Sequence, residues 1–168
     1  SSINPARYYT ANIFISQKGI DSLKFISVKY LLQPGCNTYP NSKTDPYNTP
    51  DPEAIRYNPI QNRIVWSSEG ERIIKENQTI LADPAVNIIT TDGKHIASLP
   101  LPQLLKMQAA EKGPRQNSVL EGMCFADNYQ SLYVNVEEPL YEDGPKAEKK
   151  EKNAFIRILK FDTKSNKN

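Results

Sequence analysis

Two pairs of glutamates recur at the same spacing in this 168-residue sequence, and the recurrence constrains the fold more than any other feature. The pair Glu53 and Glu69 brackets EAIRYNPIQNRIVWSSE, and the pair Glu121 and Glu137 brackets EGMCFADNYQSLYVNVE. A shift of 68 residues superposes both pairs without a gap, and five apolar positions between the acids coincide as well. The sequence therefore predicts a structural unit that is used twice.

Most of the remaining sequence has the alternation and the β-branched and aromatic content of strands. The segment from 33 to 52 is dense in Pro, Asn, Ser and Gly, which predicts a long irregular connection, and LPQLLKMQAA (101 to 110) is the one candidate helix. Asp92-Gly93 supplies the turn residues of one hairpin. The predicted strands are YYTANIFI (8 to 15), LKFISVKYLL (23 to 32), EAIRYN, RIVWSSE, VNIITT, HIASLP, VLEGMCFA, SLYVNVE and AFIRILKFD.

A unit of two hairpins that recurs in this way indicates a β-propeller blade of four antiparallel strands. We expect an all-β fold, a partial β-propeller of about two to three such blades with one short helix at most. Residues 8–32 would end one blade, 53–99 would form a whole blade, and 119–162 would supply most of a further blade. Residues 1–168 would then be a single fragment of a propeller domain, and we expect the rest of the ring to lie outside it.

Composition excludes several classes of protein. A net charge of +2 gives no reason to expect a nucleic-acid partner, and no apolar run approaches the length of a membrane span. No signal peptide is visible. Cys36 and Cys124 could form one disulfide, but two cysteines cannot make a disulfide framework, and the spacing favours two unpaired thiols.

The paired acids suggest a metal site. If each hairpin folds about the middle of its turn, Glu53 lies opposite Glu69 and Glu121 lies opposite Glu137, with Cβ atoms about 4.5 to 5.5 Å apart. Two carboxylates so placed repel unless one takes a proton, water screens them or a cation lies between them. Ca²⁺, which gathers six to eight oxygens, suits such a place.

Two further acids could add ligands to such a metal site, and the glutamates could also have an explanation that involves no metal. Asp51 and Glu138 are close enough in sequence to add ligands. Acids at strand ends can instead be simply solvated, or paired with an arginine. A one-residue slip of either hairpin would also separate its two acids onto opposite faces. The arginines available for pairing are Arg56, Arg115 and Arg157.

A candidate anion-binding set stands beside the acids. Arg56 follows Glu53 by three residues, and Arg115 and Asn117 shortly precede Glu121. Arginine can hold a phosphate or a carboxylate through two parallel hydrogen bonds, although beside carboxylates it is more often a structural partner. His95, the single histidine, is expected to be a surface or core residue rather than a catalytic one.

Several motifs, in order along the chain, resemble those of one known family. PARYYTANI resembles a segment reading roughly Pro-Ala-Arg-Phe-Tyr, DPEAIRY resembles Asp-Pro-Glu-Gly-Ile, and WSSEGE resembles Ser-Glu-Gly. RQNSVLEGMCF resembles Arg-x-Asn-x-x-Phe-Glu-Gly-Leu, EEPLYEDG resembles Glu-x-x-Leu-x-x-Asp-Gly, and FIRILKFD resembles Arg-Ile-Leu-x-Tyr-Asp. The family is the phytase-like family, described as having esterase-like activity of phytase. Ala54 replaces its usual glycine, and Leu120 stands where an aromatic residue is common.

The resemblance implies a β-propeller whose four glutamates face a central channel, with Arg56, Arg115 and Asn117 nearby. It implies an exported bacterial protein, secreted or periplasmic, and hydrolysis of phosphoesters. It covers only the middle of a typical member, so further ligands would come from other blades. Fold alone does not determine which reaction is catalysed.

Two functions are consistent with these observations. The first is a Ca²⁺-dependent phosphoester hydrolase acting on a small-molecule phosphoester or another anionic ligand. In it Glu53, Glu69, Glu121 and Glu137 are metal ligands or bases, and Arg56, Arg115 and Asn117 bind the substrate. The catalytic residues would be Glu53, Glu121, Arg56 and Arg115. The second is a non-catalytic propeller in which the acids hold a structural ion or form a Glu-Arg network along the channel.

Overall fold

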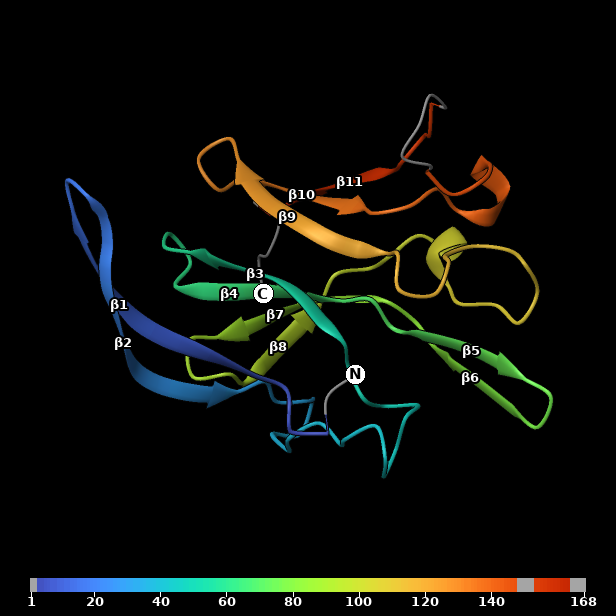
Figure 1. Ribbon diagram of the computed structural model, residues 1–168, viewed down its shortest axis with the longest axis horizontal. Helices are drawn as coiled ribbons and strands as arrows, with labels where there is room; N and C mark the ends of the chain where they lie inside the picture. Colours follow the sequence, from blue (N-terminus) through green and yellow to red (C-terminus); the bar gives the residue numbers. More distant parts are fainter. Residues whose placement is uncertain (1–2, 148–152, 164–168) are drawn as a thin grey trace.

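The computed structural model describes residues 3–147 and 153–163, and these residues form an all-β architecture of four small antiparallel sheets (Figure 1). The two helical segments are single 3₁₀ turns, η1 (Gln103–Leu105) and η2 (Tyr141–Asp143). The expectation of an all-β chain is therefore confirmed. The strands are β1 (Arg7–Ser16), β2 (Gly19–Tyr30), β3 (Pro52–Asn58), β4 (Arg63–Ser68), β5 (Glu71–Lys75), β6 (Gln78–Ala82), β7 (Ala85–Thr90), β8 (His95–Ser98), β9 (Leu120–Ala126), β10 (Ser131–Val136) and β11 (Ile158–Asp162).

The four-stranded sheet has the order β3-β4-β7-β8, with Glu53 in β3 and Glu69 directly after β4. Its two middle strands are buried almost throughout, as expected for IVWSS in β4 and VNII in β7, which are covered on both faces. Between them the chain leaves the sheet as a separate hairpin, β5-β6, which the sequence analysis did not identify. Figure 1 shows this hairpin extending away from the four-stranded sheet.

The three-stranded sheet has the order β11-β10-β9, with Glu121 in β9 and Glu137 directly after β10. Its strand β9 lies beside β3 of the four-stranded sheet (Figure 1). One hydrophobic core joins the two sheets, with Val86 and Ile88 from the first and Leu132 and Val134 from the second. The two glutamate-bearing strands are therefore held together by packing between sheets.

A second, smaller core fixes the long connection between β2 and β3. Trp66 of β4 is 1% exposed and packs with Leu31 and Ile89, while the ring of Tyr39 meets the Trp66 ring edge to face at 5.8 Å. This connection is irregular, as predicted, and its turns are closed by side chains such as Asn41 and Asp45 that accept backbone hydrogen bonds.

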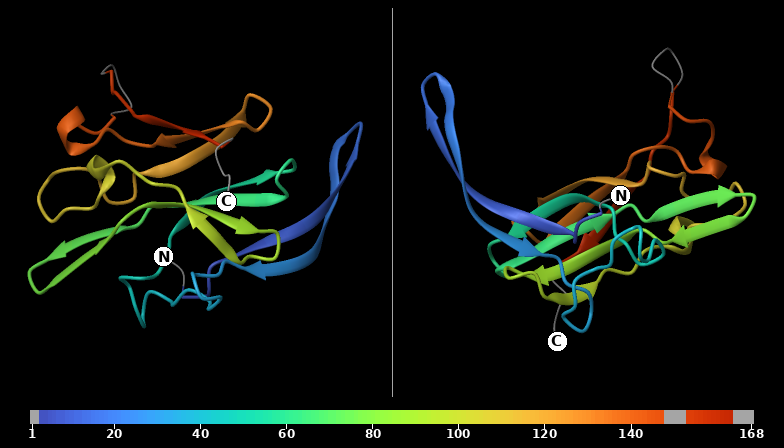
Figure 2. Two further views of the ribbon diagram at one scale, coloured as in Figure 1. Left: turned by 180° about the vertical axis from the view of Figure 1, so that it is seen from behind. Right: turned by 60° about the horizontal axis from the view of Figure 1, so that its bottom comes forward.

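The β1-β2 hairpin projects from the rest of the molecule, as both views in Figure 2 show. It pairs only within itself, and its base is tied to the body by the bond from Leu32 N–H to the Gly93 carbonyl in the β7-β8 turn. Apolar side chains along it are exposed, including Ile15, Ile20 and Phe25. The predicted strands are thus present, although the turn is shorter than expected.

The segment predicted as a helix, 101 to 110, is extended apart from the single turn η1. Lys106 has φ −72° and ψ 134°, and Met107 N–H donates to the Asp83 carboxylate at 2.8 Å rather than to a helical carbonyl. Leu105 and Met107 are buried while Lys106 is exposed, a spacing of two that places both apolar residues on the core side of an extended chain. The prediction of a helix here was wrong, because the apolar residues of this segment pack against the core from a mostly non-helical chain.

The part of the chain that the structure describes includes no helix of the length and apolar character that a membrane span requires.

Candidate metal centre

Glu53 and Glu121 each lie at a β-bulge, and this decides where their side chains sit. In the first sheet the pairing steps from Ile55 opposite Trp66 to Pro52 opposite Ser68, so β3 carries one extra residue at 53–54. In the second sheet it steps from Gly122 opposite Asn135 to Leu120 opposite Val136, so β9 carries one extra residue at Glu121. A bulge re-aims a side chain and disrupts the local ladder.

The predicted registers were therefore wrong. Glu53 was expected opposite Glu69, whereas the Glu69 N–H donates a hydrogen bond to the carbonyl of Asp51 at 3.1 Å. Glu121 was expected opposite Glu137, whereas the Glu137 N–H donates a hydrogen bond to the carbonyl of Val119 at 2.7 Å. Both hairpins depart from the prediction by two residues. One comes from the turn, because the regular pairing, with Ile55 opposite Trp66 and Phe125 opposite Leu132, is already one residue away from the predicted register, and the other comes from the bulge.

The acids nevertheless converge, and Glu69 is where they meet. The carboxylate oxygens of Asp51, Glu53 and Glu69 lie within 4.8 Å of one another, and so do those of Glu69, Glu121 and Glu137. Glu69 belongs to both sets. We call these five residues the acidic cluster.

Glu69 is the buried member of the acidic cluster, with 3% of its surface exposed. Its Oε1 accepts a 2.8 Å hydrogen bond from the backbone N–H of Val119, which immediately precedes β9. Glu121 and Asp51 are half-buried, and Glu53 and Glu137 are exposed. The cluster therefore has a buried central carboxylate surrounded by partly or fully exposed ones. The central residue, Glu69, forms hydrogen bonds to Asp51 beside one sheet and to Val119 beside the other.

The electrostatics of the cluster favour a bound proton or cation. Burial is the main reason that the pKa of Glu69 is raised from 4.5 to about 7, and the charges of Glu121 and Glu53 raise it further against the opposing hydrogen bond from Val119. The pKa of Glu53 is raised by partial desolvation, then by Glu121 and Asp51. Loss of hydration also raises the pKa of Glu137. Repulsion of this kind is relieved by a positive charge at the centre.

The donor set fits a hard cation. Every ligand atom is a carboxylate oxygen, and oxygen-only sites suit Ca²⁺, Mg²⁺ or Mn²⁺ rather than Zn²⁺. Two oxygens on opposite sides of a Ca²⁺ ion lie about 4.6 to 5.2 Å apart, twice the usual bond length of about 2.3 to 2.6 Å. The 4.8 Å limit within each set is compatible with that span.

Three consecutive residues at the end of β4 and just after it, Ser67, Ser68 and Glu69, hold the backbone around the cluster in place. The two serines were not identified as site residues from the sequence. Ser68 Oγ accepts a 3.0 Å hydrogen bond from the N–H of Asp51. Ser67 Oγ accepts from the N–H of Ala54 at 3.1 Å and donates to the carbonyl of Leu120 at 2.9 Å. The signal available in the sequence was the polar run Ser-Ser-Glu at the end of an otherwise apolar strand.

The arginines predicted to bind an anion form their hydrogen bonds with backbone carbonyls and not with the acidic cluster. Arg115 donates to the carbonyls of Pro139 at 2.9 Å and Gly144 at 2.6 Å, and its guanidinium lies 4.2 Å from the centre of the Tyr141 ring. Arg56 is exposed and donates to the carbonyl of Ile55.

The other candidates of the sequence analysis lie outside the cluster. Asn117 is exposed with a positive φ of 50°, and its side-chain oxygen accepts a hydrogen bond from Gln116. Glu138, expected to add a ligand, instead accepts a hydrogen bond from the N–H of Ala147 at 2.7 Å. His95 Nε2 lies 3.1 Å from Ser98 Oγ, and partial burial lowers the pKa of His95.

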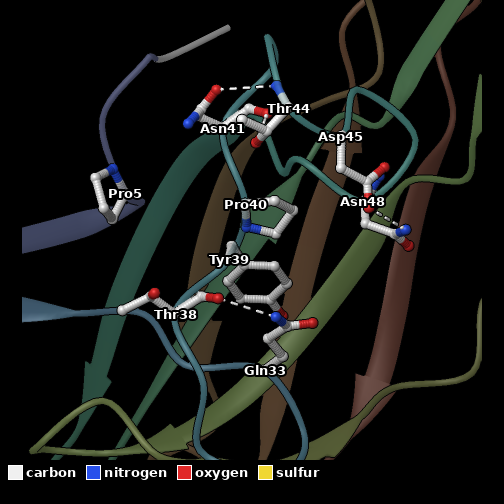
Figure 3. A pocket seen from close by; sticks show the side chains of 9 residues that line it. All are labelled: Pro5, Gln33, Thr38, Tyr39, Pro40, Asn41, Thr44, Asp45 and Asn48. Atoms are coloured by element: carbon white, nitrogen blue, oxygen red, sulfur yellow. Dashed lines mark hydrogen bonds between the residues drawn. The ribbon is translucent and has the colours of Figure 1, made fainter.

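A wide depression of about 570 Å³ lies on the irregular connection (Figure 3), and none of the residues that line it belongs to the acidic cluster. Tyr39 forms part of its wall, together with the side chains of Asn41, Thr44 and Asp45. Many of its polar atoms already close turns, such as Asn41 Oδ1, which accepts from the N–H groups of Lys43 and Thr44. Its lining is therefore explained by loop structure.

Comparisons with known proteins agree with the resemblance carried by the motifs. None of the curated proteins and none of the solved structures that were compared matches the chain. One family model does match, and it covers residues 1–168, the whole sequence. The chain therefore belongs to the phytase-like family, which is described as having esterase-like activity of phytase.

Proposed function

We propose that this protein is a metal-dependent phosphoester hydrolase whose acidic cluster holds Ca²⁺. The observation that carries the proposal is the convergence of two three-carboxylate sets on one buried glutamate, Glu69. Membership of the phytase-like family supports phosphoesters as the general class of substrate. A bound cation would neutralise phosphate charge and lower the pKa of a coordinated water.

The residues of this chain would have distinct parts in that chemistry. Glu69 is held by Val119 N–H and belongs to both sets, so it would be the fixed ligand. Glu53 and Glu137 are exposed at the rim, where a carboxylate can meet both a ligand and solvent, and one of them would accept the proton of the attacking water. Arg56, exposed on β3, would bind a phosphate oxygen.

We also propose that these sheets are propeller blades, with 8–32 ending one blade, 53–99 forming a whole blade and 119–162 forming most of another. The four-stranded antiparallel order β3-β4-β7-β8 and the packing of β9 beside β3 support this architecture. The matching bulges at Glu53 and Glu121 support a repeated unit. On this architecture the cluster would face a central channel, and the rest of the ring would supply further ligands. The family resemblance supports an exported protein, secreted or periplasmic.

One specific observation favours a second function, a non-catalytic propeller that binds an ion for structural reasons. Arg115, the other candidate phosphate ligand, is occupied by two backbone carbonyls and the Tyr141 ring. If no phosphate is turned over, the acidic cluster would still bind a cation that neutralises repulsion between the sheets.

The decisive experiment measures phosphate release and thermal unfolding on the same protein. Release of phosphate from p-nitrophenyl phosphate and from inositol phosphates is assayed with Ca²⁺, after chelation by EDTA, and after Ca²⁺ is restored. We expect activity to disappear with EDTA, to return with Ca²⁺ and to be lost in Glu69→Gln. The matched control is Glu76→Gln, at an exposed position in the β5-β6 turn.

The outcomes separate the two functions. Full activity in EDTA contradicts the metal-dependent mechanism. A melting temperature that rises with Ca²⁺, in a protein that releases phosphate from none of these esters, supports the ion-binding module instead. If Ca²⁺ changes neither phosphate release nor the melting temperature, both proposed functions are contradicted.

A further inference from the structure

The hydroxyl group of Ser67 connects the backbones of the two sheets at one buried point. Ser67 has no exposed surface. Its Oγ accepts a 3.1 Å hydrogen bond from the N–H of Ala54 in β3 and donates a 2.9 Å hydrogen bond to the carbonyl of Leu120 in β9. A hydroxyl is a small group that donates and accepts at once, so one side chain can satisfy both strands.

The two bonded groups are the immediate neighbours of two acids in the cluster. Ala54 directly follows Glu53, and Leu120 directly precedes Glu121. Both acids lie at bulges, where regular pairing is interrupted and the backbone needs a partner from elsewhere. Ser67 supplies that partner to each bulge at once.

The second sheet places a polar side chain at the corresponding position. Asn135 pairs with Gly122, just as Ser67 faces the bulge at Ala54, and a Cβ added to Gly122 would lie 2.0 Å from the Asn135 side-chain oxygen. Asn135 is 68 residues beyond Ser67, the offset that also relates the glutamate pairs. A polar side chain from the partner strand therefore lies against each bulge.

We infer that Ser67 is a positioning residue, which sets the separation of the Glu53 and Glu121 carboxylates on either side of Glu69 by tying their two bulges together. This inference rests on the proposed function, in which those carboxylates bind a cation. Without the hydroxyl, Ala54 N–H and the Leu120 carbonyl would be buried without this partner, and the two strands would lose the link that fixes their spacing.

The test compares three variants of the 168-residue chain. Ser67→Ala removes the link, and Ser67→Thr keeps a hydroxyl group. Ser131→Ala is the matched control, because Ser131 is another buried strand serine whose Oγ donates a hydrogen bond, to Asp127 at 2.6 Å, at the other end of β10. Ca²⁺ affinity is measured by calorimetry, and backbone amide exchange is measured by NMR in metal-free protein.

We expect Ser67→Ala to weaken Ca²⁺ binding by about ten-fold, because the variant loses both hydrogen bonds of the hydroxyl and only part of their free energy bears on the arrangement of the carboxylates. In the metal-free protein we expect faster amide exchange at both Glu53–Ala54 and Glu121–Gly122, although only one sheet carries the substitution. Ser67→Thr should restore most of the affinity. Ser131→Ala should change neither Ca²⁺ binding nor exchange at these four residues.

The amide measurement keeps the inference testable independently of metal. Unchanged exchange at both bulges in Ser67→Ala overturns it, as does unchanged affinity in a protein whose wild type binds Ca²⁺. If the wild type binds no Ca²⁺ while Ser67→Ala loosens both bulges, the proposed function fails and the positioning role stands. If Ser67→Ala does not fold, restored exchange protection at both bulges in Ser67→Thr supports the link, and loosened bulges in that variant contradict it.

Discussion

The backbone N–H of Val119 donates a 2.8 Å hydrogen bond to the carboxylate of Glu69, and this bond crosses from the strand segment before β9 to the end of β4. The most buried acid of the cluster, which follows a strand of one sheet, is thereby held in place by the backbone of the other sheet. Burial at this position is the main reason that the pKa of Glu69 is raised to about 7, and the charges of Glu121 and Glu53 raise it further, while the Val119 hydrogen bond opposes the increase.

The sharing of Glu69 by two carboxylate sets predicts unequal effects of substitution on Ca²⁺ affinity. Glu69→Gln keeps an oxygen for Val119 but removes a charge from both sets, so we expect affinity to fall by at least about 100-fold. Glu53→Gln and Glu137→Gln each alter one set, and we expect losses of about ten-fold. Isothermal titration calorimetry measures all three. Equal losses in the three variants would contradict a shared central ligand.

The raised pKa of Glu69 predicts that metal-free protein becomes less stable as pH rises. A carboxyl group with a higher pKa in the folded state binds more protons there, so its contribution is fully present below about pH 4.5 and is lost toward pH 7. The loss is on the order of 3 kcal/mol. Urea unfolding in EDTA at pH 4.5 and pH 7 measures it. Glu69→Gln should flatten this dependence and Glu76→Gln should retain it.

The close approach of backbone at Gly70 predicts strong destabilisation by a methyl group. Gly70 has φ +78°, and an added Cβ would lie 2.2 Å from the carbonyl oxygen of Ala82. Gly70→Ala must move the end of β6 away from Glu69. Gly19→Ala is the control, because Gly19 also has a positive φ, +124°, but faces open space. Backbone strain alone costs about 1 kcal/mol, or about 2 to 4 °C, and we expect Gly70→Ala to lower the melting temperature at least twice as much.

The two arginines are expected to respond differently to substitution. Arg115 holds the carbonyls of Pro139 and Gly144, so Arg115→Gln should reduce stability by about 2 kcal/mol. Arg56 is exposed, so Arg56→Gln should leave the melting temperature unchanged and raise KM for a phosphoester several-fold. Thermal unfolding and steady-state kinetics separate these effects. A changed KM in Arg115→Gln with unaltered stability would instead support the role predicted from sequence.

The two cysteines are free and exposed, in agreement with the preference expressed from their spacing. Cys36 lies in the connection after β2, and Cys124 lies on β9. We therefore expect two thiols per chain to react with a thiol reagent in native protein, without a denaturant and without a reductant. One reactive thiol or none would show that the pair is oxidised or covered in solution.

The strands were predicted correctly where apolar and polar residues alternate strongly. The predictions failed where strands are short and exposed, or where a backbone group bonds to a side chain distant in sequence. The β5-β6 hairpin was missed because its strands ERIIK and QTILA are short and mostly not buried, so they lack a long apolar alternation. The helix at 101–110 was wrong because Asp83 takes the N–H of Met107, a partner distant in sequence. Long-range partners of this kind are not visible in local patterns.

The members of the acidic cluster were predicted apart from Glu138, which lies outside it, whereas the predicted geometry was wrong. The identity and spacing of the four glutamates were sufficient to propose that they meet, and Asp51 was named as a further ligand. The register was wrong by one residue from the turn of each hairpin and by one more at the bulge, and neither feature leaves a distinctive pattern in the sequence. The engagement of Arg115 by Tyr141 could not be read from sequence either, since the ring comes from a turn 26 positions later.

The extra residue in β3 and in β9 makes the cluster depend on chain length as well as on chemistry. At each bulge two residues lie opposite one residue of the partner strand, so deleting the extra residue would restore a regular ladder and remove the bend that directs the Glu53 or Glu121 side chain into the cluster. Every acid could then be retained in the sequence while the ion-binding arrangement was lost. Alignments that allow a gap beside Glu53 or Glu121 would consequently group together chains that differ in this property.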